Sequence, residues 1–198
     1  INVYRNGIII GTHRKDLIVR VSDCDITTAN PLPDFVTCDG FDVQFSHTSI
    51  GANTVFWDFG VAAILNDTSN IGTPSYIYPD TGVYNVKFVI NRGTGCADSV
   101  TRKVGVFPGF VPGFISTGNC YLNPFQFRDT TNPRYGFVNS WRWNFGDGTT
   151  LADTSRIRNP QWIYPASGQK DVSMIVTSNK GCIDTAQVTI TVLDKPLI

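Results

Sequence analysis

The sequence predicts an all-β protein made of tandem antiparallel β-sandwiches. Three observations support this fold class: the composition, the alternation of apolar and polar residues in short segments, and an internal repeat. Aromatic residues make up 12% of the chain, and 18 Gly and 11 Pro are dispersed among Val, Ile, Thr, Phe and Tyr. Turn formers placed between β-branched and aromatic residues indicate many short strands. We find no long stretch with the period of an amphipathic helix.

Charge and hydropathy exclude several classes of partner. Lys plus Arg and Asp plus Glu each number 16, so the formal net charge is zero. Nucleic acids and anionic membranes attract clustered Lys and Arg, and we expect neither as a partner. No apolar run approaches the roughly 20 residues of a membrane-spanning helix, so we expect no membrane insertion. The chain opens on a strand-like segment without the features of a signal peptide, and we expect it to be a piece of a longer protein.

An internal repeat sets the domain organisation. Segments that match at an offset of 86 positions are 57–60 with 143–146, 76–79 with 162–165, and 95–98 with 181–184. Upstream, 43–46 matches 125–128 at an offset of 82. The second copy therefore carries four extra residues, which we place near 132–136.

We expect three parts in the chain. Residues 1–30 are the C-terminal part of a preceding β domain, in which Asn6-Gly7 predicts a type I′ hairpin turn and 16–21 a closing strand. Residues 31–107 and 108–198 are then two β-sandwiches. Each copy holds about seven alternating segments, which is typical of the immunoglobulin-like sandwich. A closed barrel is the alternative, but it gains nothing from a disulfide that joins its first and last strands.

Four of the five cysteines follow the repeat. Cys38 and Cys96 lie near the start and the end of the first copy, and Cys120 and Cys182 take the same places in the second. An early and a late strand of a sandwich can approach to the ~5.5 Å Cα separation of a disulfide, so we predict the bonds Cys38–Cys96 and Cys120–Cys182. Cys24 is then unpaired within the chain. The alternative is four free, buried thiols. The absence of C-x-x-C argues against zinc, and disulfides imply an oxidising compartment.

Three elements, found in order and twice, resemble the PKD (polycystic kidney disease) repeat. Its pattern is W-x-F-G-D-G, then an aromatic-rich Y-x-x-x-G, then an alternating V-x-L-x-V strand. Residues 143–148, 163–168 and 171–177 match it fully. The first copy has Val61-Ala62 in place of Asp-Gly, and we expect its turn geometry to differ. The resemblance covers roughly residues 32–193 and implies PKD-type immunoglobulin-like sandwiches. The cysteines and the G-C-x-D-[ST] element are similar to those of PKD-type modules in large surface proteins of gliding Bacteroidetes.

No pattern in the sequence indicates catalysis, and we expect neither enzyme activity nor a cofactor. His13 lies in a polar connection and His47 in a strand-to-turn segment, without a nucleophile elbow, phosphate loop or metal-ligand helix. Asn144, Asp147 and Asp153 could offer oxygen ligands to calcium, but calcium takes six to eight. The alternative is a tight turn capped by an Asp, and we expect no metal.

Ser99 and Thr185 are candidate modification sites at equivalent positions of the two copies. Each follows an Asp and precedes an aliphatic residue, which resembles the acceptor of O-linked glycans in Bacteroidetes surface proteins. The alternative is a strand start at which the Asp and the hydroxyl satisfy backbone N–H groups.

Phe107, Phe110 and Phe114 lie in the Pro- and Gly-rich junction between the copies. They could form a ligand platform. We expect them instead to pack between the copies and to stiffen the junction, because buried aromatics restrict hinge motion.

These expectations favour a non-catalytic spacer in the extracellular stalk of a bacterial cell-surface adhesin, with gliding motility as a candidate process. Tandem copies, a stiff junction, zero net charge and disulfides suit a stalk that is exposed to shear and proteases. The alternative is an accessory module of a secreted hydrolase that binds polysaccharide or protein. A third hypothesis is a docking module for an outer-membrane secretion or motility protein. Neighbouring repeats of the same chain are expected partners in each case.

Overall fold

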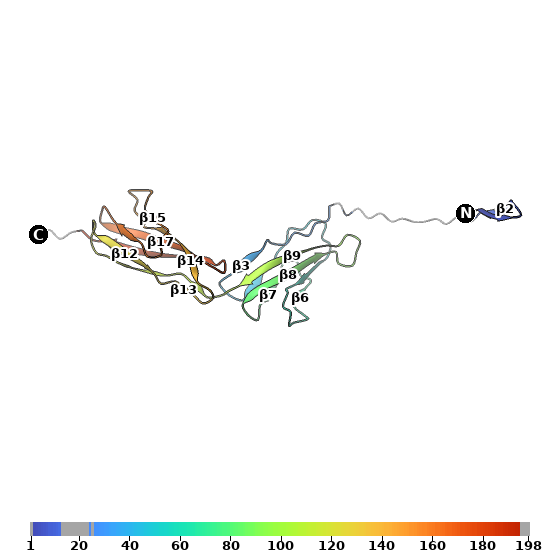
Figure 1. The fold of residues 1–198 in the computed structure, drawn as a ribbon, viewed down its shortest axis with the longest axis horizontal. Coiled ribbons are helices and arrows are strands. Elements are labelled where there is room, and N and C mark those ends of the chain that lie inside the picture. Colours follow the sequence, from blue (N-terminus) through green and yellow to red (C-terminus); the bar gives the residue numbers. More distant parts are fainter. Residues whose placement is uncertain (1, 13–23, 25, 195–198) are drawn as a thin grey trace.

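The computed structural model describes residues 2–12, 24 and 26–194. Every regular element in these residues is a β-strand, and the strands form an all-β fold with two tandem immunoglobulin-like sandwiches. The two sandwiches follow one another along the long axis of the molecule (Figure 1). The predicted fold class is therefore confirmed.

A short hairpin precedes the sandwiches. β1 (Asn2–Arg5) pairs antiparallel with β2 (Ile8–Thr12). Asn6 and Gly7 join the two strands with φ angles of 50° and 82°. These are the positive values that a type I′ turn needs, so the predicted hairpin is confirmed. His13 and the strand expected over residues 16–21 lie outside the described residues.

The first copy consists of seven strands. They are β3 (Phe35–Thr37), β4 (Asp42–Gln44), β5 (Val55–Asp58), β6 (Thr68–Ser69), β7 (Ser75–Ile77), β8 (Gly82–Ile90) and β9 (Asp98–Val106). Five of them form a sheet in the order β3-β9-β8-β5-β6, and β4 pairs with β7. β3 runs parallel to β9, with Thr37 beside Val106, whereas the other pairs of this copy are antiparallel. The parallel pair places the start and the end of the copy side by side.

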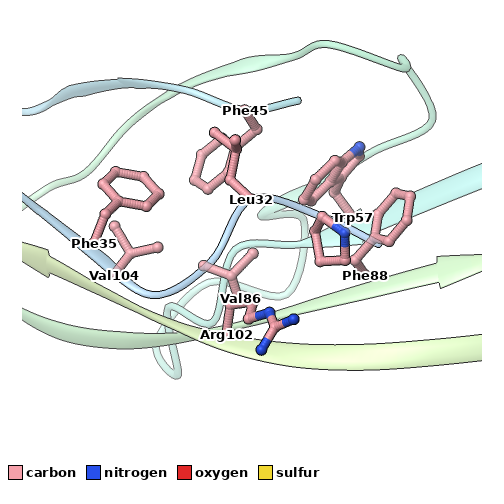
Figure 2. A pocket seen from close by; sticks show the side chains of 9 residues that line it. Leu32, Phe35, Phe45, Trp57, Val86, Phe88, Arg102 and Val104 are labelled. Atoms are coloured by element: carbon pink, nitrogen blue, oxygen red, sulfur yellow. The ribbon is translucent and has the colours of Figure 1, made fainter. Parts of the chain in front are cut away.

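The core of the first copy forms around Trp57 on β5, which is 1% exposed. Its indole Nε1 donates a hydrogen bond to the carbonyl oxygen of Ile71 at 3.1 Å. The Phe45 ring lies 5.5 Å from the Trp57 ring and 5.1 Å from the Phe59 ring. Figure 2 shows Phe45, Trp57 and Phe88 around a hollow of about 10 Å³, which is room for about one water molecule. This interior is a packed core and not a ligand cavity.

The second copy consists of nine strands. They are β10 (Phe110–Val111), β11 (Phe114–Thr117), β12 (Pro124–Asp129), β13 (Asn132–Pro133), β14 (Val138–Asn144), β15 (Thr154–Ser155), β16 (Gln161–Ile163), β17 (Gly168–Ser178) and β18 (Ile183–Val192). One sheet has the order β15-β14-β17-β18, another has the order β11-β12-β16, and β10 pairs with β13. The extra residues placed near 132–136 thus supply the added strand β13, in which Pro133 lies beside Phe110.

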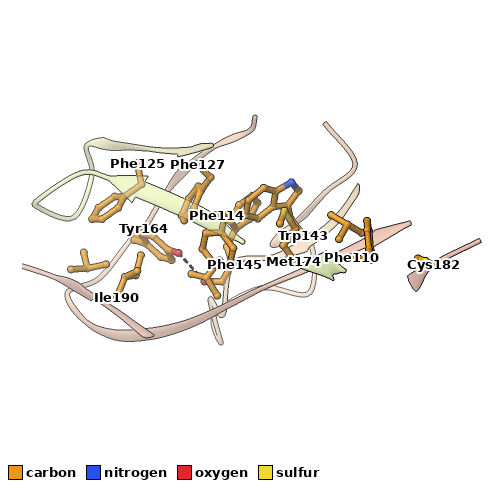
Figure 3. Close-up of a cluster of buried hydrophobic side chains, with 13 residues drawn as sticks. Phe110, Phe114, Phe125, Phe127, Trp143, Phe145, Tyr164, Met174, Cys182 and Ile190 are labelled. Carbon is orange, nitrogen blue, oxygen red and sulfur yellow. Dashed lines mark hydrogen bonds between the residues drawn. The ribbon is translucent and has the colours of Figure 1, made fainter. Parts of the chain in front are cut away.

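The core of the second copy, drawn in Figure 3, has the same arrangement as that of the first. Trp143 is fully buried, and its Nε1 donates a hydrogen bond to the Ile157 carbonyl oxygen at 3.0 Å. Tyr164 is also fully buried, and its hydroxyl donates to the Phe145 carbonyl oxygen at 2.8 Å. Both Trp side chains therefore lie in the centre of their sandwiches.

The first copy begins earlier than the sequence predicts. Thr28 forms a bridge with Ile50, and Pro31 forms one with His47. Ala29 is buried in the first core, and its N–H donates to an Asp98 carboxylate oxygen at 2.8 Å. Residues 28–30 thus pack on the first copy, and the boundary expected at residue 30 lies too far downstream. No alternating pattern marks this segment, because it pairs through single bridges.

The predicted disulfide pairing is wrong. The structure forms Cys24–Cys96, with Cα atoms 5.2 Å apart, and Cys38–Cys182, with Cα atoms 5.8 Å apart, and Cys120 is free. Cys24, expected to be unpaired, therefore has a partner within the chain.

The cause is the direction of β3. Because β3 is parallel to β9, Cys38 lies near the end of β9, whereas Cys96 lies just before its start. The nine residues of β9 span about 30 Å at ~3.3 Å per residue, far beyond the reach of a disulfide. In the second copy, Cys120 forms an isolated β-bridge with Leu193, just after β18, whereas Cys182 lies just before β18. Cys120 and Cys182 are therefore equally far apart.

Candidate functional site at the junction between the copies

A disulfide joins the two copies covalently. Cys38 directly follows β3, and Cys182 lies in the turn between β17 and β18. β3 carries Cys38 to the edge of the first copy from which the chain leaves. The turn between β17 and β18 lies at the facing edge of the second copy, so the bond crosses from one sandwich to the other.

The connecting segment is hydrogen-bonded to both copies. The Phe107 N–H donates to the Thr37 carbonyl oxygen, and the Gly109 N–H donates to the Cys38 carbonyl oxygen, each at 3.0 Å. On the other side, the Arg134 N–H donates to the Gly109 carbonyl oxygen at 3.1 Å. The first copy is therefore bonded to Phe107 and Gly109, and the second copy to Gly109, which leaves no flexible linker of the Gly/Ser type between them.

The three junction phenylalanines have different roles, and only one lies between the copies. Phe110 and Phe114 are each 7% exposed and belong to the core of the second copy, where the Phe114 ring lies 5.0 Å from the Trp143 ring. Phe107 is half-buried, and the Lys180 Nζ lies 5.3 Å from the centre of its ring. The expected packing between the copies is thus corrected for Phe110 and Phe114. Their spacing in β10 and β11 points them into their own sandwich.

Gly181 allows the turn of the second copy to reach the first. It has a φ of 91°, a left-handed conformation that favours glycine. A Cβ atom there would lie 3.2 Å from the Val36 Cγ2 of the first copy. A larger residue would combine backbone strain with pressure on Val36, so glycine permits the close approach beside Cys182.

The Trp-x-Phe-Gly turns of the two copies begin alike, contrary to the expectation that they differ. The Val61 N–H donates to an Asp67 carboxylate oxygen at 2.6 Å, and the Asp147 N–H donates to an Asp153 carboxylate oxygen at 2.8 Å. Gly60 and Gly146 both have positive φ, of 76° and 66°. These bonds use the backbone of the residue after the glycine, so replacing Asp by Val preserves them.

The side chain of Asp147 adds bonds that the first copy lacks. Its Oδ1 accepts from the Thr149 N–H at 3.2 Å and from the Thr149 hydroxyl at 2.8 Å. Burial, together with the charges of Asp147 and Asp153, raises the pKa of the Tyr164 hydroxyl above its ordinary value. The arrangement is that of a capped turn beside a neutral tyrosine. Among the described residues, no three His, Cys, Asp or Glu side chains are grouped to hold a metal ion.

Ser99 and Thr185 are exposed at the starts of β9 and β18. The Ser99 N–H donates to Asp98 Oδ1 at 2.8 Å, and the Thr185 N–H donates to Asp184 Oδ1 at 2.7 Å. The aspartates thus satisfy backbone donors, while both hydroxyls remain accessible.

His47 has a structural placement. Its ring lies 5.0 Å from the Phe88 ring, and its Nδ1 accepts a hydrogen bond from the Ser49 N–H at 3.3 Å. These contacts pack the ring on the core of the first copy and offer no nucleophile for it to activate.

Comparison with known proteins agrees with this architecture. The family model described as the PKD domain matches residues 34–106 and 120–192. The chain belongs to the PKD domain family. The two matched segments coincide with the two sandwiches, so this protein is a tandem of PKD domains.

Individual relatives are similar to one of the two domains in sequence, or to both domains only in fold. The pre-pro-metalloprotease PrtV of Vibrio cholerae is 35% identical over 65 residues, which is 33% of this chain and 7% of the metalloprotease. The crystal structure of its PKD1 domain is 31% identical, covering 44% of this chain and 99% of that one, with a TM-score of 0.39. Fibronectin(III)-like modules of Clostridium thermocellum CbhA cover 85% of this chain and 94% of theirs, at 17% identity and a TM-score of 0.53. PKD domains thus occur as modules of larger proteins.

In the part of the chain that the structure describes, no helix is long and apolar enough to cross a membrane.

Proposed function

We propose that this chain is a non-catalytic spacer in the extracellular stalk of a bacterial cell-surface adhesin, with gliding motility as a candidate process. The observation that supports the proposal most strongly is the Cys38–Cys182 bond between the copies. A disulfide and backbone hydrogen bonds at one junction restrict bending and keep the sandwiches in line. A projecting stalk needs this property, whereas a catalytic module does not.

The cysteine chemistry supports an extracellular location. Structural disulfides persist in oxidising compartments and are rare in a reducing cytosol. Four of the five cysteines are bonded, each to a residue distant in sequence, 72 or 144 positions away. Such bonds also hold partly unfolded chains together, which suits a surface exposed to shear and proteases.

Solution scattering tests the spacer. We expect one elongated particle whose maximum dimension is the same in 50 mM and 500 mM NaCl, because covalent and hydrogen bonds hold the junction. A broad range of bend angles in the oxidised wild-type chain contradicts the spacer.

The second candidate function is an accessory module of a secreted hydrolase that binds polysaccharide or protein. The similarity to one PKD domain of a metalloprotease favours it. Calorimetric titration with soluble polysaccharides separates the two functions. The spacer predicts no heat of binding at millimolar sugar, and saturable binding supports the accessory module.

Exposed Ser99 and Thr185 fit the further proposal that the stalk carries O-linked glycans. The mass of the chain purified from its native host should exceed the sequence mass by whole glycans. The double variant Ser99→Ala, Thr185→Ala should lose this excess mass.

A further inference from the structure

Cys120 occupies in the second copy the place that Cys38 occupies in the first. The Leu193 N–H donates to the Asn119 carbonyl oxygen at 2.8 Å, as the Phe107 N–H donates to the Thr37 carbonyl oxygen at 3.0 Å. These two bonds are equivalent at the offsets of 82 and 86 positions that relate the copies. In each copy, the cysteine directly follows a residue whose carbonyl oxygen accepts a hydrogen bond from the first residue after the last strand.

The two disulfides indicate the role of this position. Cys38 bonds to Cys182 in the turn between β17 and β18 of the next copy. Cys96, which lies in the equivalent turn of the first copy, is bonded to Cys24 upstream of that copy. Both turn cysteines therefore bond to a cysteine that precedes their own copy. Cys120 has the position from which Cys38 forms a disulfide with the following copy. It is free and half-buried.

Other partners within the chain are excluded by geometry. Cys182 lies at the opposite end of β18, a ten-residue strand that spans about 33 Å at ~3.3 Å per residue. The remaining cysteines are already bonded. Within the described residues, no group of three metal-binding side chains surrounds Cys120.

We propose that Cys120 forms a disulfide with the turn cysteine of a further copy of this domain that follows Leu193. Bond formation removes one proton from each thiol, and the two electrons reduce the disulfide of an oxidant of the thiol–disulfide exchange class to two thiols. The proposal rests on the proposed spacer and deepens it: consecutive copies are joined by one disulfide at every junction, so that the array is cross-linked along its length.

The test uses the whole chain, extended by repeating residues 108–193 directly after Leu193. The repeat supplies a turn equivalent to 181–182 at the same place relative to Cys120 as Cys182 has relative to Cys38, apart from the four extra residues of the second copy. After oxidation with a glutathione redox couple, non-reducing peptide mapping should link Cys120 to the turn cysteine of the repeat. One free thiol per chain should remain, the repeat's own counterpart of Cys120.

The matched control is Cys120→Ser in the extended chain, which should leave two free thiols and an intact Cys38–Cys182 bond. If Cys120 stays free while Cys38–Cys182 forms, or if Cys120 links two chains into a dimer, the proposal is overturned. A measurement on the 198-residue chain is independent of the extension. Cys120 should react with a maleimide in the folded protein. Complete protection from the reagent contradicts the proposed disulfide, because the thiol must be accessible to form it. Scattering of the unextended chain still tests the spacer itself, so the two failures are distinguishable.

Discussion

Cys38 and Cys182 are 144 positions apart in sequence, yet their Cα atoms lie 5.8 Å apart. The bond between them turns two PKD domains into one covalently braced unit. It forms because a parallel first strand and an antiparallel hairpin turn bring their ends to the same junction. Cys182 is buried in the core of the second copy and Cys38 packs against that core, so the bond anchors the first copy directly to the core of the second.

Replacing Cys182 by Ser should loosen the junction. The chain-entropy model assigns about 5 kcal/mol to a closed loop of this length, shared between the two copies. We expect a broader distance distribution in scattering and a lower melting temperature in calorimetry. Cys120→Ser is the matched control and should change neither quantity. Equal scattering curves for both variants would show that hydrogen bonds alone fix the junction.

Phe110→Ser should destabilise the second copy and not merely loosen the junction. Phe110 is buried in the second core, and removing a buried Phe side chain typically costs about 3–5 kcal/mol. Phe107→Ser is the control at the half-exposed junction position and should cost much less. Two-transition calorimetry can assign the loss to one copy. If Phe110→Ser leaves both transitions in place, Phe110 does not have the core role described.

Local patterns predicted most of the fold. The 86-position repeat, the alternation along β17 and β18, and the Asn6-Gly7 turn each carry their information within a few neighbouring residues. The burial of Trp57 and Trp143 follows, because the apolar face of a strand has only one core to enter.

The junction could not be predicted in the same way. Whether β3 runs parallel or antiparallel to β9 depends on which end of the copy it joins, and three residues, Phe35–Thr37, carry no signal for that choice. This choice explains the failed Cys38–Cys96 prediction, whereas Cys120–Cys182 failed because Cys120 lies beside Leu193, at the far end of β18 from Cys182. The assignment of Phe110 to the junction failed because Pro and Gly neighbours conceal the start of the short strand β10.

Calcium should not stabilise either copy. In the first copy Val61 replaces the Asp147 carboxylate, and in the second the Asp147 Oδ1 is already bonded to Thr149. A ligand at a hundred times its dissociation constant adds about 2.7 kcal/mol, which would raise the melting temperature of a domain this size by roughly 10 °C or more. Melting in calcium and in chelator should therefore agree. A clear rise with calcium would show that the Asp147 turn binds the ion.

Stability should fall in alkaline solution. Burial raises the pKa of the Tyr78 and Tyr164 hydroxyls, both of which donate to backbone carbonyl oxygens. An unfolded tyrosine ionises near pH 10, so above this pH the unfolded state binds fewer protons than the folded state. The stabilisation is fully present below pH 10 and is lost above it, at about 1.4 kcal/mol per pH unit for each tyrosine. Denaturant titrations at pH 8.5 and 11 measure the loss, and Tyr164→Phe should reduce it. A pH-independent midpoint contradicts the burial of these hydroxyls.

Two neighbouring glycines of the second copy should respond very differently to alanine. Gly146 has a φ of 66°, and a Cβ there would collide with the Asp171 carbonyl oxygen and lie 2.8 Å from the Asp171 nitrogen. Both atoms belong to the backbone of β17, which cannot move without breaking the sheet. Gly148 is the matched control, since a Cβ there meets nothing within 4 Å. We expect Gly146→Ala to cost more than ~2 kcal/mol of unfolding free energy, because backbone strain and steric overlap add, and Gly148→Ala to change it by less than ~0.5 kcal/mol. Equal unfolding midpoints for the two variants in guanidinium titrations would mean that the turn relaxes away from β17. The close packing of the Trp-x-Phe-Gly turn on that strand would then not contribute to stability.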